Sequence, residues 1–292
     1  MKEITITLTR YKEPNWLLFQ TLSSLAQQKN IRATVLMLDQ QDDKETKEYC
    51  AQLTTTYISF VRKKIEAVWL SFARNQAIAL CNTDILLCID ADAIADEQRA
   101  YELTETFSYD DRIALVWGKI LPKFHAAPPF LMQLNFVYDM YSLLDRGNEV
   151  APFSKVVGAS YGIHIARMWK EAYLDLQLWR KPWVLLWGEE TDLCMRAKAL
   201  NLLIYYTWKA VVYHQILPER LTYIWIFKRT YRGWYSRAVQ WGMPQPNSMQ
   251  KKTWHLFFGL LLAPIYAGWY LRGWRLKKSM LLLSKEPTHE KK

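Results

Sequence analysis

The chain has 292 residues, of which 51% are hydrophobic and 23% are charged. This composition excludes an intrinsically disordered chain, and the length suits one large α/β domain with an appendage. The four cysteines lack the C-x-x-C spacing of a zinc site and do not suggest a disulfide framework. Their usage favours a reducing compartment.

The net charge of +10 is concentrated in the last quarter of the chain. Residues 1–218 contain 24 lysines and arginines against 25 acidic residues, whereas residues 219–292 contain 14 against 3. A nearly neutral body is therefore joined to a basic tail that is also rich in tryptophan. Such a tail predicts an anionic surface as its partner, either a membrane or a nucleic acid.

Strand-like and helix-like segments alternate through the first part of the chain. The pattern predicts strands at 4–8, 33–38, 57–61 and 84–89, separated by helices at 16–27, 43–54 and 70–81. Alternation of this kind predicts a parallel sheet with right-handed crossovers, whose ligands bind where the strands end. The polar residues expected along that edge are Thr9, Arg10, Tyr11, Asp39, Asp90 and Asp92.

Asp90 and Asp92 directly follow the predicted strand at 84–89. Side chains two residues apart leave a strand on the same face, so the two carboxylates can hold a hard divalent cation with positions left for phosphate oxygens. The pattern favours a metal-assisted enzyme that uses a nucleotide. The alternative is a strand end that carries ordinary solvated acids.

Three further side chains suit a bound nucleotide. Asp39 can accept a hydrogen bond from a base N–H while Tyr11 offers a ring to pack against it. Alternatively, Asp39 caps the next helix. Arg74 has paired donors for a base oxygen or a phosphate, and its alternative is a salt bridge to a local acid such as Asp84.

Seven segments, taken in order, carry a resemblance to a known family: residues 9–14, 36–39, 73–75, 90–92, 157–160, 187–193 and 213–214. Over about residues 3–216 the chain resembles glycosyltransferase family 2. The resemblance implies an α/β fold with a Rossmann-like, mostly parallel sheet of the GT-A type, in a catalytic domain that we place at residues 1–216. It also implies a nucleoside-diphosphate sugar as donor, and an aspartate at position 39 favours UDP or dTDP.

The resemblance also implies roles for individual residues. Asp90 would contact the ribose or the metal, and Asp92 would ligate Mg²⁺ or Mn²⁺ that bridges the diphosphate. His214 is similar to the third protein ligand, and an imidazole tilts the choice towards Mn²⁺; by itself, a histidine beside a strand is more often a packed or surface residue. The nucleotide-binding residues implied are Thr9, Tyr11, Asp39, Arg74 and Asp90.

Glu190 stands where the family usually has the aspartate that acts as general base. An inverting transfer would therefore use Glu190 to deprotonate the acceptor hydroxyl. The extra methylene moves the carboxylate by about 1.5 Å, which makes Asp192 the reserve candidate. Trp187, Glu189 and Gly158 would lie near the acceptor. The alternative is that these acids only favour the N-terminus of a helix.

Residues 217–292 are predicted to form a basic, Trp-rich helical region that associates with a membrane. Residues 221–241 interleave aromatic side chains with lysines and arginines, as expected of an amphipathic helix at a lipid interface. Residues 254–271 are hydrophobic, run without a formal charge and are followed by four cations. This stretch either spans the membrane, re-enters it or lies on it, and no nucleic acid is expected as a partner.

The sequence therefore predicts a metal-dependent, inverting glycosyltransferase at the cytoplasmic face of the cell membrane, held there as a peripheral or monotopic protein. Its acceptor would be a saccharide, either lipid-linked or another membrane glycan precursor. Two alternatives stay open: a nucleotidyltransferase, and a catalytically inactive protein that binds carbohydrate or lipid.

Overall fold

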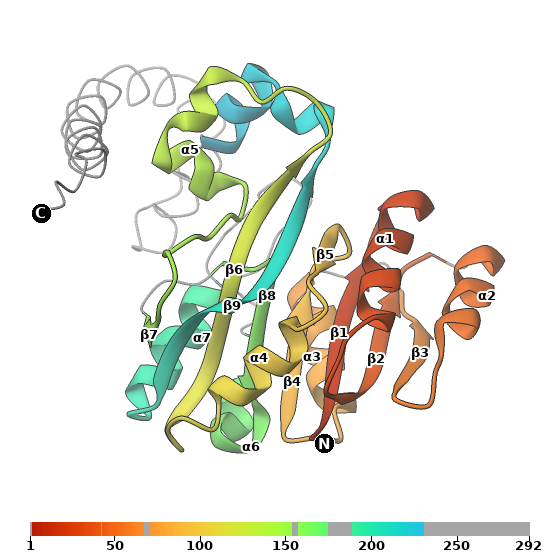
Figure 1. Cartoon of the computed structure of the whole chain (residues 1–292), viewed down its shortest axis with the longest axis vertical. Helices are drawn as coiled ribbons and strands as arrows, with labels where there is room; N and C mark the ends of the chain where they lie inside the picture. The colour runs from red at the N-terminus through yellow and green to blue at the C-terminus, as the bar shows by residue number, and fades with distance from the viewer. Residues whose placement is uncertain (1, 42, 67–69, 154–156, 175–188, 231–292) are drawn as a thin grey trace, which may run out of the picture. The chain divides into compact units, whose positions relative to one another are not determined.

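The computed structural model describes residues 2–41, 43–66, 70–153, 157–174 and 189–230. All of these belong to the first of two compact units, Met1–Arg237, whereas the second, Ala238–Lys292, lies outside the described residues. In the described part of the chain, nine strands form one sheet in the order β3-β2-β1-β4-β8-β6-β9-β5, and β7 pairs with β9 beside this path (Figure 1).

The first half of the sheet confirms the predicted alternation. It consists of β1 (Glu3–Arg10), α1 (Asn15–Ala26), β2 (Arg32–Asp39), α2 (Lys44–Leu53), β3 (Ile58–Lys64), α3 (Leu70–Leu80) and β4 (Ile85–Ile89). The four strands run parallel, with β1 between β2 and β4. Every residue of β4 is buried, because a strand inside such a sheet is covered on both faces.

The second half of the sheet is mixed. Its elements are β5 (Ala93–Ala95), α4 (Arg99–Thr106), β6 (Ile113–Phe124), η1 (Phe130–Gln133), α5 (Asn135–Met140), β7 (Val150–Pro152), β8 (Ser160–His164), α6 (Ile165–Met168), η2 (Trp169–Ala172), α7 (Glu189–Ala199), β9 (Leu203–Ile216) and η4 (Pro218–Leu221). β8 is antiparallel to β4 and β6, β6 runs parallel to β9, and β9 is antiparallel to β5 and β7. The continuous run of parallel strands thus extends from β3 to β4, and β6 with β9 adds one parallel pair to an otherwise antiparallel second half.

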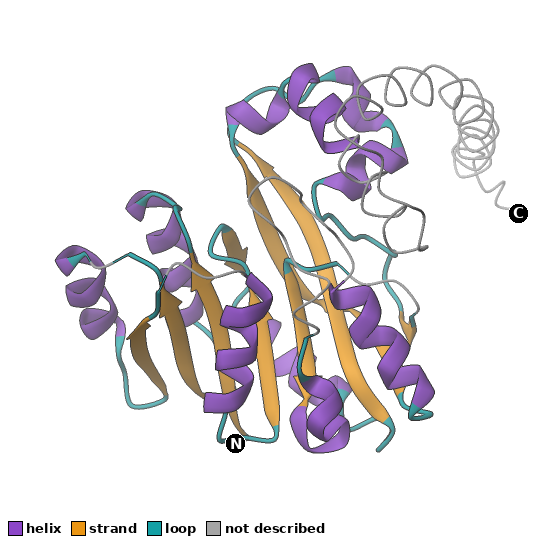
Figure 2. Cartoon of the chain, turned by 180° about the vertical axis from the view of Figure 1, so that it is seen from behind, coloured by secondary structure: helices purple, strands orange, loops and turns teal. Residues whose placement is uncertain are grey.

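Helices cover both faces of the sheet. α1 and α4 lie on the face turned towards the viewer in Figure 1, and α3 and α7 lie on the face turned towards the viewer in Figure 2. The α1 residues Leu18, Leu22 and Leu25 recur at helical spacing and are buried in the main core. α3 buries Ala73 and Ala77 in a second, smaller cluster. Apolar side chains of α1 and α3 therefore pack against the sheet from opposite faces.

Residues 217–230 pack against the rest of the described unit. After η4 the chain is helical from residue 223 to residue 230. Trp225 stacks on Tyr141 with 4.6 Å between ring centroids, and Ile226 is buried. The first part of the predicted tail therefore contributes to the folded unit. None of the helices among the described residues is long and apolar enough to cross a membrane.

Asp43 connects the start of α2 to the end of β1. Its side chain accepts a hydrogen bond from the backbone N–H of Thr46 at 2.7 Å and another from the buried Arg10. Burial opposes ionisation, but the hydrogen bonds from Thr46 and Arg10 outweigh it and lower the pKa of Asp43 to about 2. The ionised group therefore stabilises the fold above pH 3.8, and this stabilisation is lost as the pH falls towards 2.

We expect Asp43→Ala to lower the free energy of unfolding at neutral pH by about 1–2 kcal/mol, because it removes the helix cap. Asp43→Asn keeps an oxygen acceptor for Thr46 and should lose less. Urea denaturation followed by circular dichroism measures both changes. An alanine variant as stable as the wild type would contradict this role for Asp43.

Candidate active site

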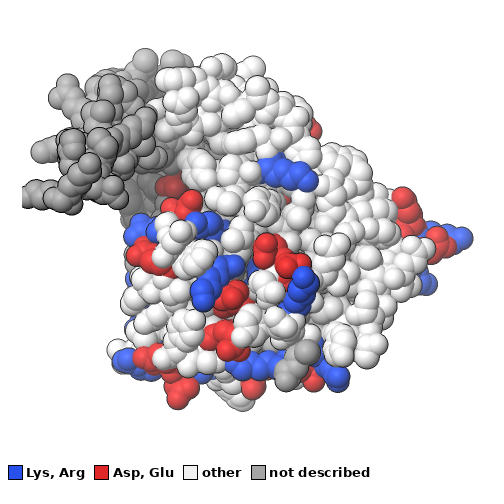
Figure 3. All heavy atoms as spheres, in the orientation of Figure 1, with Lys and Arg blue, Asp and Glu red and all other residues white. Residues whose placement is uncertain are grey.

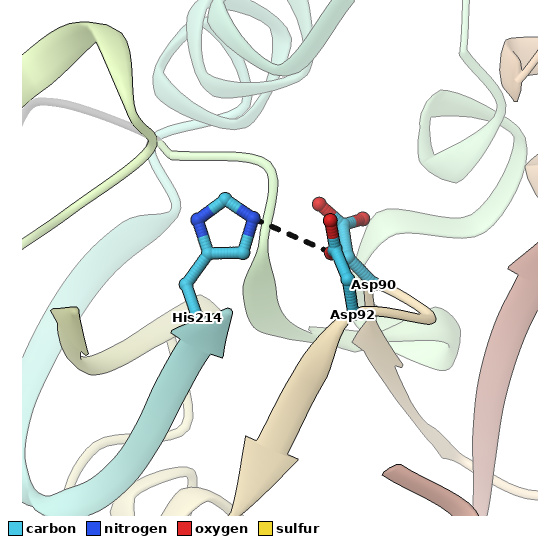
Figure 4. A group of neighbouring side chains, drawn as sticks. All are labelled: Asp90, Asp92 and His214. Atoms are coloured by element: carbon cyan, nitrogen blue, oxygen red, sulfur yellow. Dashed lines mark ion pairs between the residues drawn. The ribbon is translucent and has the colours of Figure 1, made fainter. Parts of the chain in front are cut away.

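Three side chains that can bind a metal meet where β4 ends and β5 pairs with β9. Asp90 follows β4, Asp92 precedes β5, and His214 lies in β9 opposite Ala93. One ligand atom from each of the three lies within 4.8 Å of the other two. Figure 4 shows the imidazole facing the two carboxylates. The fold thus brings together the residues that the sequence predicts as metal ligands.

Asp92 and His214 are buried and orient each other. His214 Nε2 lies 3.3 Å from Asp92 Oδ1, and His214 Nδ1 lies 2.7 Å from the backbone carbonyl oxygen of Tyr141. Because a carbonyl oxygen only accepts hydrogen bonds, Nδ1 carries a proton and Nε2 is directed at the carboxylate. Arg220 Nη1 lies 3.1 Å from the second oxygen of Asp92. Each oxygen of this carboxylate therefore faces a nitrogen of a basic side chain.

Opposing effects set the pKa values of this pair. Burial raises the pKa of Asp92, but His214 and Arg220 outweigh it and lower the pKa to about 2. Burial lowers the pKa of His214, but the Asp92 carboxylate outweighs it and raises the pKa. Two carboxylates and an imidazole form a donor set that fits Mn²⁺ well and Mg²⁺ less well. The residues present therefore suit a divalent metal.

Arg74 links the acidic pair to the candidate base. This buried residue of α3 donates from Nη1 to Glu190 Oε1 at 2.8 Å. From Nη2 it donates to Asp90 Oδ1 at 3.3 Å and to the carbonyl oxygen of Gly158 at 3.1 Å. Its acidic partners in the described part of the chain are thus Asp90 and Glu190, and not the local Asp84. The cation joins three segments of the site.

Gly158 gives the Glu190 carboxylate room. A Cβ atom at residue 158 would lie only 2.3 Å from Glu190 Oε1 and 3.5 Å from Arg74 Nη2. Any larger residue would therefore displace the carboxylate. Of the other residues predicted near the acceptor, Glu189 begins α7, and Trp187 lies outside the described residues.

The two candidate bases of α7 have different partners. Asp192 Oδ2 accepts a hydrogen bond from Arg196 Nε, one helical turn later, at 2.9 Å. Glu190 instead pairs with Arg74. The structure thus brings Glu190, rather than Asp192, to the acidic pair.

Asp39 is held inside the fold at the end of β2. Its Oδ2 accepts a hydrogen bond from Arg62 Nε at 2.6 Å, and its Oδ1 accepts one from the backbone N–H of Gln41 at 2.9 Å. The carboxylate is fully buried. The predicted alternative, that Asp39 caps α2, is not what the structure contains, because Asp43 caps that helix. A nucleotide base that donated a hydrogen bond to Asp39 would have to displace Arg62 or Gln41, or share a carboxylate oxygen with one of them.

Thr9 and Tyr11 lie on the same edge of the sheet as Asp39. Thr9 is half-buried near the end of β1, in register with Leu38. Tyr11 follows the strand and is exposed, with Lys12 Nζ 5.0 Å from the centre of its ring. An aromatic face is therefore available at the surface beside the buried carboxylate.

Arg220 is a site residue that the sequence analysis did not single out. It lies in η4, is partly exposed, and its backbone carbonyl accepts a hydrogen bond from the Tyr141 hydroxyl at 2.7 Å. Dividing the chain at residue 216 assigned Arg220 to the tail, where it is one of 14 cations. The sequence does contain one indication of its role, because Arg220 closely follows His214, a predicted metal ligand.

Comparison with known proteins places the chain in a family. The model of glycosyl transferase family 2 matches residues 5–150. No curated protein matches the sequence. The crystal structure of GalNAc-T7 with UDP, GalNAc and Mn²⁺ is similar at 12% identity, with a TM-score of 0.56 over 79% of this chain and 48% of that chain. The crystal structure of S. aureus TarS is similar at 13% identity, with a TM-score of 0.52 over 79% of this chain and 38% of that chain.

The chain therefore covers about half of the length of the GalNAc-T7 structure and less than half of the length of the TarS structure. At these sequence identities, the similarity shows the fold alone. The mixed α/β sheet resembles that of GT-A glycosyltransferases. With half of its residues matched by the family model, the chain belongs to glycosyl transferase family 2.

Proposed function

We propose that this protein transfers a sugar, with inversion, from a nucleoside-diphosphate sugar to a hydroxyl of a saccharide acceptor, with the help of a divalent metal. The observation that carries this proposal is the contact of Arg74 with both Asp90 and Glu190, because it sets a candidate base beside the candidate metal ligands. Membership of glycosyl transferase family 2 supports the reaction class. The GalNAc-T7 complex with UDP and Mn²⁺ supports this kind of nucleotide and metal.

UDP is our preferred donor nucleotide, with dTDP as the second choice. The base would lie at the ends of β1 and β2, where Tyr11 offers an exposed ring and Asp39 offers a carboxylate oriented by Arg62. The diphosphate would lie towards Asp92. There Arg220, which has paired donors, would add positive charge beside the leaving group.

Asp90, Asp92 and His214 would hold Mn²⁺ or Mg²⁺, and the imidazole favours Mn²⁺. When bound, the metal neutralises charge on the departing nucleoside diphosphate. The chain prepares this position through the Tyr141 carbonyl, which fixes the His214 ring so that Nε2 faces the carboxylates.

Glu190 would take the proton from the attacking hydroxyl. Arg74 binds Oε1 and so orients the carboxylate, which leaves Oε2 to accept the proton. The side chain is longer than the usual aspartate by one methylene, about 1.5 Å. The missing side chain at Gly158 provides the room that this longer residue needs. Attack on the face opposite the diphosphate would invert the anomeric centre.

A lipid-linked acceptor and attachment to the cytoplasmic face of the membrane, peripheral or monotopic, complete the proposal. Three large side chains of the helical residues 223–230 are exposed to solvent. The exposed fraction is 52% for Tyr223, 68% for Ile224 and 67% for Phe227. The excess of 14 cations over 3 acids in residues 219–292 suits anionic lipid. We expect no nucleic-acid partner.

The first test concerns the metal. Asp92→Asn keeps the size of the side chain but removes an ionised ligand, so it should abolish the Mn²⁺-dependent part of UDP binding. His214→Ala should weaken that part less, because both carboxylates remain. Calorimetric titration with UDP, with and without Mn²⁺, measures the effect. Asp96→Asn, which changes a carboxylate after β5 outside the metal group, is the matched control.

Asp92 is buried against two basic side chains, so a change there also affects stability. Thermal unfolding of each variant separates loss of the fold from loss of the metal ligand. A folded Asp92→Asn protein with the Mn²⁺ dependence of the wild type would reject the metal assignment.

The second test separates chemistry from donor binding. Glu190→Gln cannot accept the proton, so transfer should fall by roughly a hundredfold or more while UDP binding persists. Asp192→Asn, its matched comparison on α7, should lower transfer much less. UDP released from UDP-sugars in the presence of saccharide or lipid-linked acceptors reports the rate.

Full turnover in Glu190→Gln with loss in Asp192→Asn would move the role to Asp192. A wild type that binds UDP with Mn²⁺ but transfers no sugar would instead favour the inactive binding protein.

The third test concerns the tail. Replacing Lys228, Arg229, Arg232 and Arg237 with glutamine should reduce binding to anionic vesicles to the level seen with neutral vesicles, since each cation contributes on the order of 1 kcal/mol there. Vesicle flotation measures it. The control replaces four exposed cations of the body with glutamine: Lys29, Lys44, Lys47 and Arg112.

Wild-type protein should stay with anionic vesicles at high salt, because burial of the apolar residues 254–271 in lipid is not screened. Complete release by salt alone would mean that this stretch packs within the protein.

A further inference from the structure

A shallow groove runs along the outer face of α1 and has no part in the proposed transfer. Its volume is about 320 Å³, and side chains of α1 line it together with Tyr49 of α2 and Ile94 of β5. α1 faces the viewer in Figure 1, and the corresponding area of Figure 3 is almost free of charged side chains. The volume is at the lower end of the range for small-ligand sites.

The lining of this α1 groove combines aromatic rings with uncharged polar groups. Trp16 is 49% exposed, and the rings of Phe19 and Tyr49 stack with 4.0 Å between centroids. Gln20 contributes an amide, whose Oε1 accepts a hydrogen bond from Lys123 Nζ at 2.9 Å and whose Nε2 donates to the carbonyl oxygen of Trp16 at 3.3 Å. Ser23 contributes a hydroxyl that is hydrogen-bonded to the Tyr49 hydroxyl at 2.5 Å. Among the described residues that line the groove, none is charged. The cation beside these lining residues is Lys123, whose ammonium group is held by Gln20 Oε1.

This set of groups matches the chemistry of a neutral sugar. The C–H faces of a sugar ring pack on aromatic rings, which present large rigid apolar faces. Amides and hydroxyls both donate and accept hydrogen bonds, as the hydroxyls of a sugar require. The exposed ring of Trp16, the stacked rings and the uncharged lining thus favour a neutral carbohydrate, whose hydroxyls can share the hydrogen bonds that Gln20 and Ser23 already make.

α1 also ties the groove to the acidic pair. On the buried side of the helix, Thr21 Oγ1 donates to the carbonyl oxygen of Ala91, between Asp90 and Asp92, at 2.9 Å. One helix therefore supports the candidate metal ligands on one side and forms the groove on the other.

A second connection starts at Trp16. Its ring meets that of His125 edge-on, with 5.3 Å between centroids, and His125 Nε2 is hydrogen-bonded to Gln215 Oε1 at 3.1 Å. The backbone N–H of Gln215, the residue after His214, donates to the carbonyl oxygen of Asp92 at 2.9 Å. One end of the groove is thus linked to the metal ligands through a short chain of direct contacts.

We propose that the α1 groove is a second saccharide-binding site that holds an uncharged stretch of the acceptor glycan away from the transfer centre. Its substrate class rests on the proposed function, because a glycosyltransferase meets glycans as acceptors and products. Occupancy of the groove would raise the local concentration of acceptor beside the site. Binding there requires neither donor nor metal.

The test uses the full chain in a detergent without a sugar headgroup, since an alkyl glycoside would itself compete. Neutral hexasaccharides of glucose, mannose, galactose, xylose and N-acetylglucosamine are immobilised as an array, and binding is measured without nucleotide or metal. We expect at least one to bind. Trp16→Ala should weaken that binding roughly tenfold, the loss expected for one ring contact. Trp208→Ala, which removes an exposed tryptophan of β9 outside the groove, is the matched control.

Thermal unfolding checks that Trp16→Ala is folded. Gln27→Trp provides a second variant, because it obstructs the groove at an exposed position without removing a packed side chain, and it should also weaken binding. Absence of binding to every hexasaccharide by the wild type, or wild-type binding by both groove variants, would overturn the inference.

UDP binding with Mn²⁺ and UDP release by the same preparation report separately on the proposed function. If the protein binds UDP and transfers sugar but binds no saccharide in the array, the proposal for the α1 groove is rejected and the proposed function stands. If the protein binds a saccharide through Trp16 but neither binds UDP nor transfers sugar, the α1 groove is supported as a saccharide-binding site and the proposed function is rejected.

Discussion

The guanidinium group of Arg74 holds together three parts of the chain that are distant in sequence. It pairs with Asp90 after β4, with the carbonyl of Gly158 before β8 and with Glu190 at the start of α7. A buried cation is unfavourable unless hydrogen-bonded partners surround it. The three segments are therefore constrained to one arrangement, and the separation between the acidic pair and the candidate base follows from the reach of one planar group.

The charges around this centre are balanced in a way that bears on ligand binding. The acids Asp90, Asp92 and Glu190 face Arg74, Arg220 and His214, which is directed at Asp92. A divalent cation alone would add charge to a site that is already nearly compensated. A nucleoside diphosphate alone would add opposite charge. The two together cancel most of each other's charge, so the electrostatics favour their joint binding over the separate binding of either.

Local patterns in the sequence were enough to predict the first half of the fold. β1 to β4 and the helices between them have a clear periodicity, and their ends are set by nearby residues such as Asp43. The sequence carried no comparable pattern for the antiparallel position of β8 between β4 and β6, since pairing between distant strands leaves no local period.

The same limit applied to the site. The candidate metal ligands and the candidate base could be identified from the sequence, because they lie in short segments that resemble a family. These residues are Asp90, Asp92, His214 and Glu190. The sequence analysis did not identify their partners, because the contacts of the Tyr141 carbonyl with His214 and of Arg220 with Asp92 join residues that are far apart in sequence.

The pairing of β5 with β9 determines when the site is complete during synthesis. The contacts among β1–β4 join residues that are closer in sequence than those between β5 and β9, so they can form earlier as the chain leaves the ribosome. Asp92 can pair with His214 only after β6, β8 and α7 have been synthesised, because His214 lies in β9, which follows them in the chain. A chain interrupted before β9 would have the ends of β1, β2 and β4 and both carboxylates, yet neither the imidazole nor the strand that pairs with β5. Such a fragment would therefore lack one of the three candidate metal ligands, however complete its first four strands are.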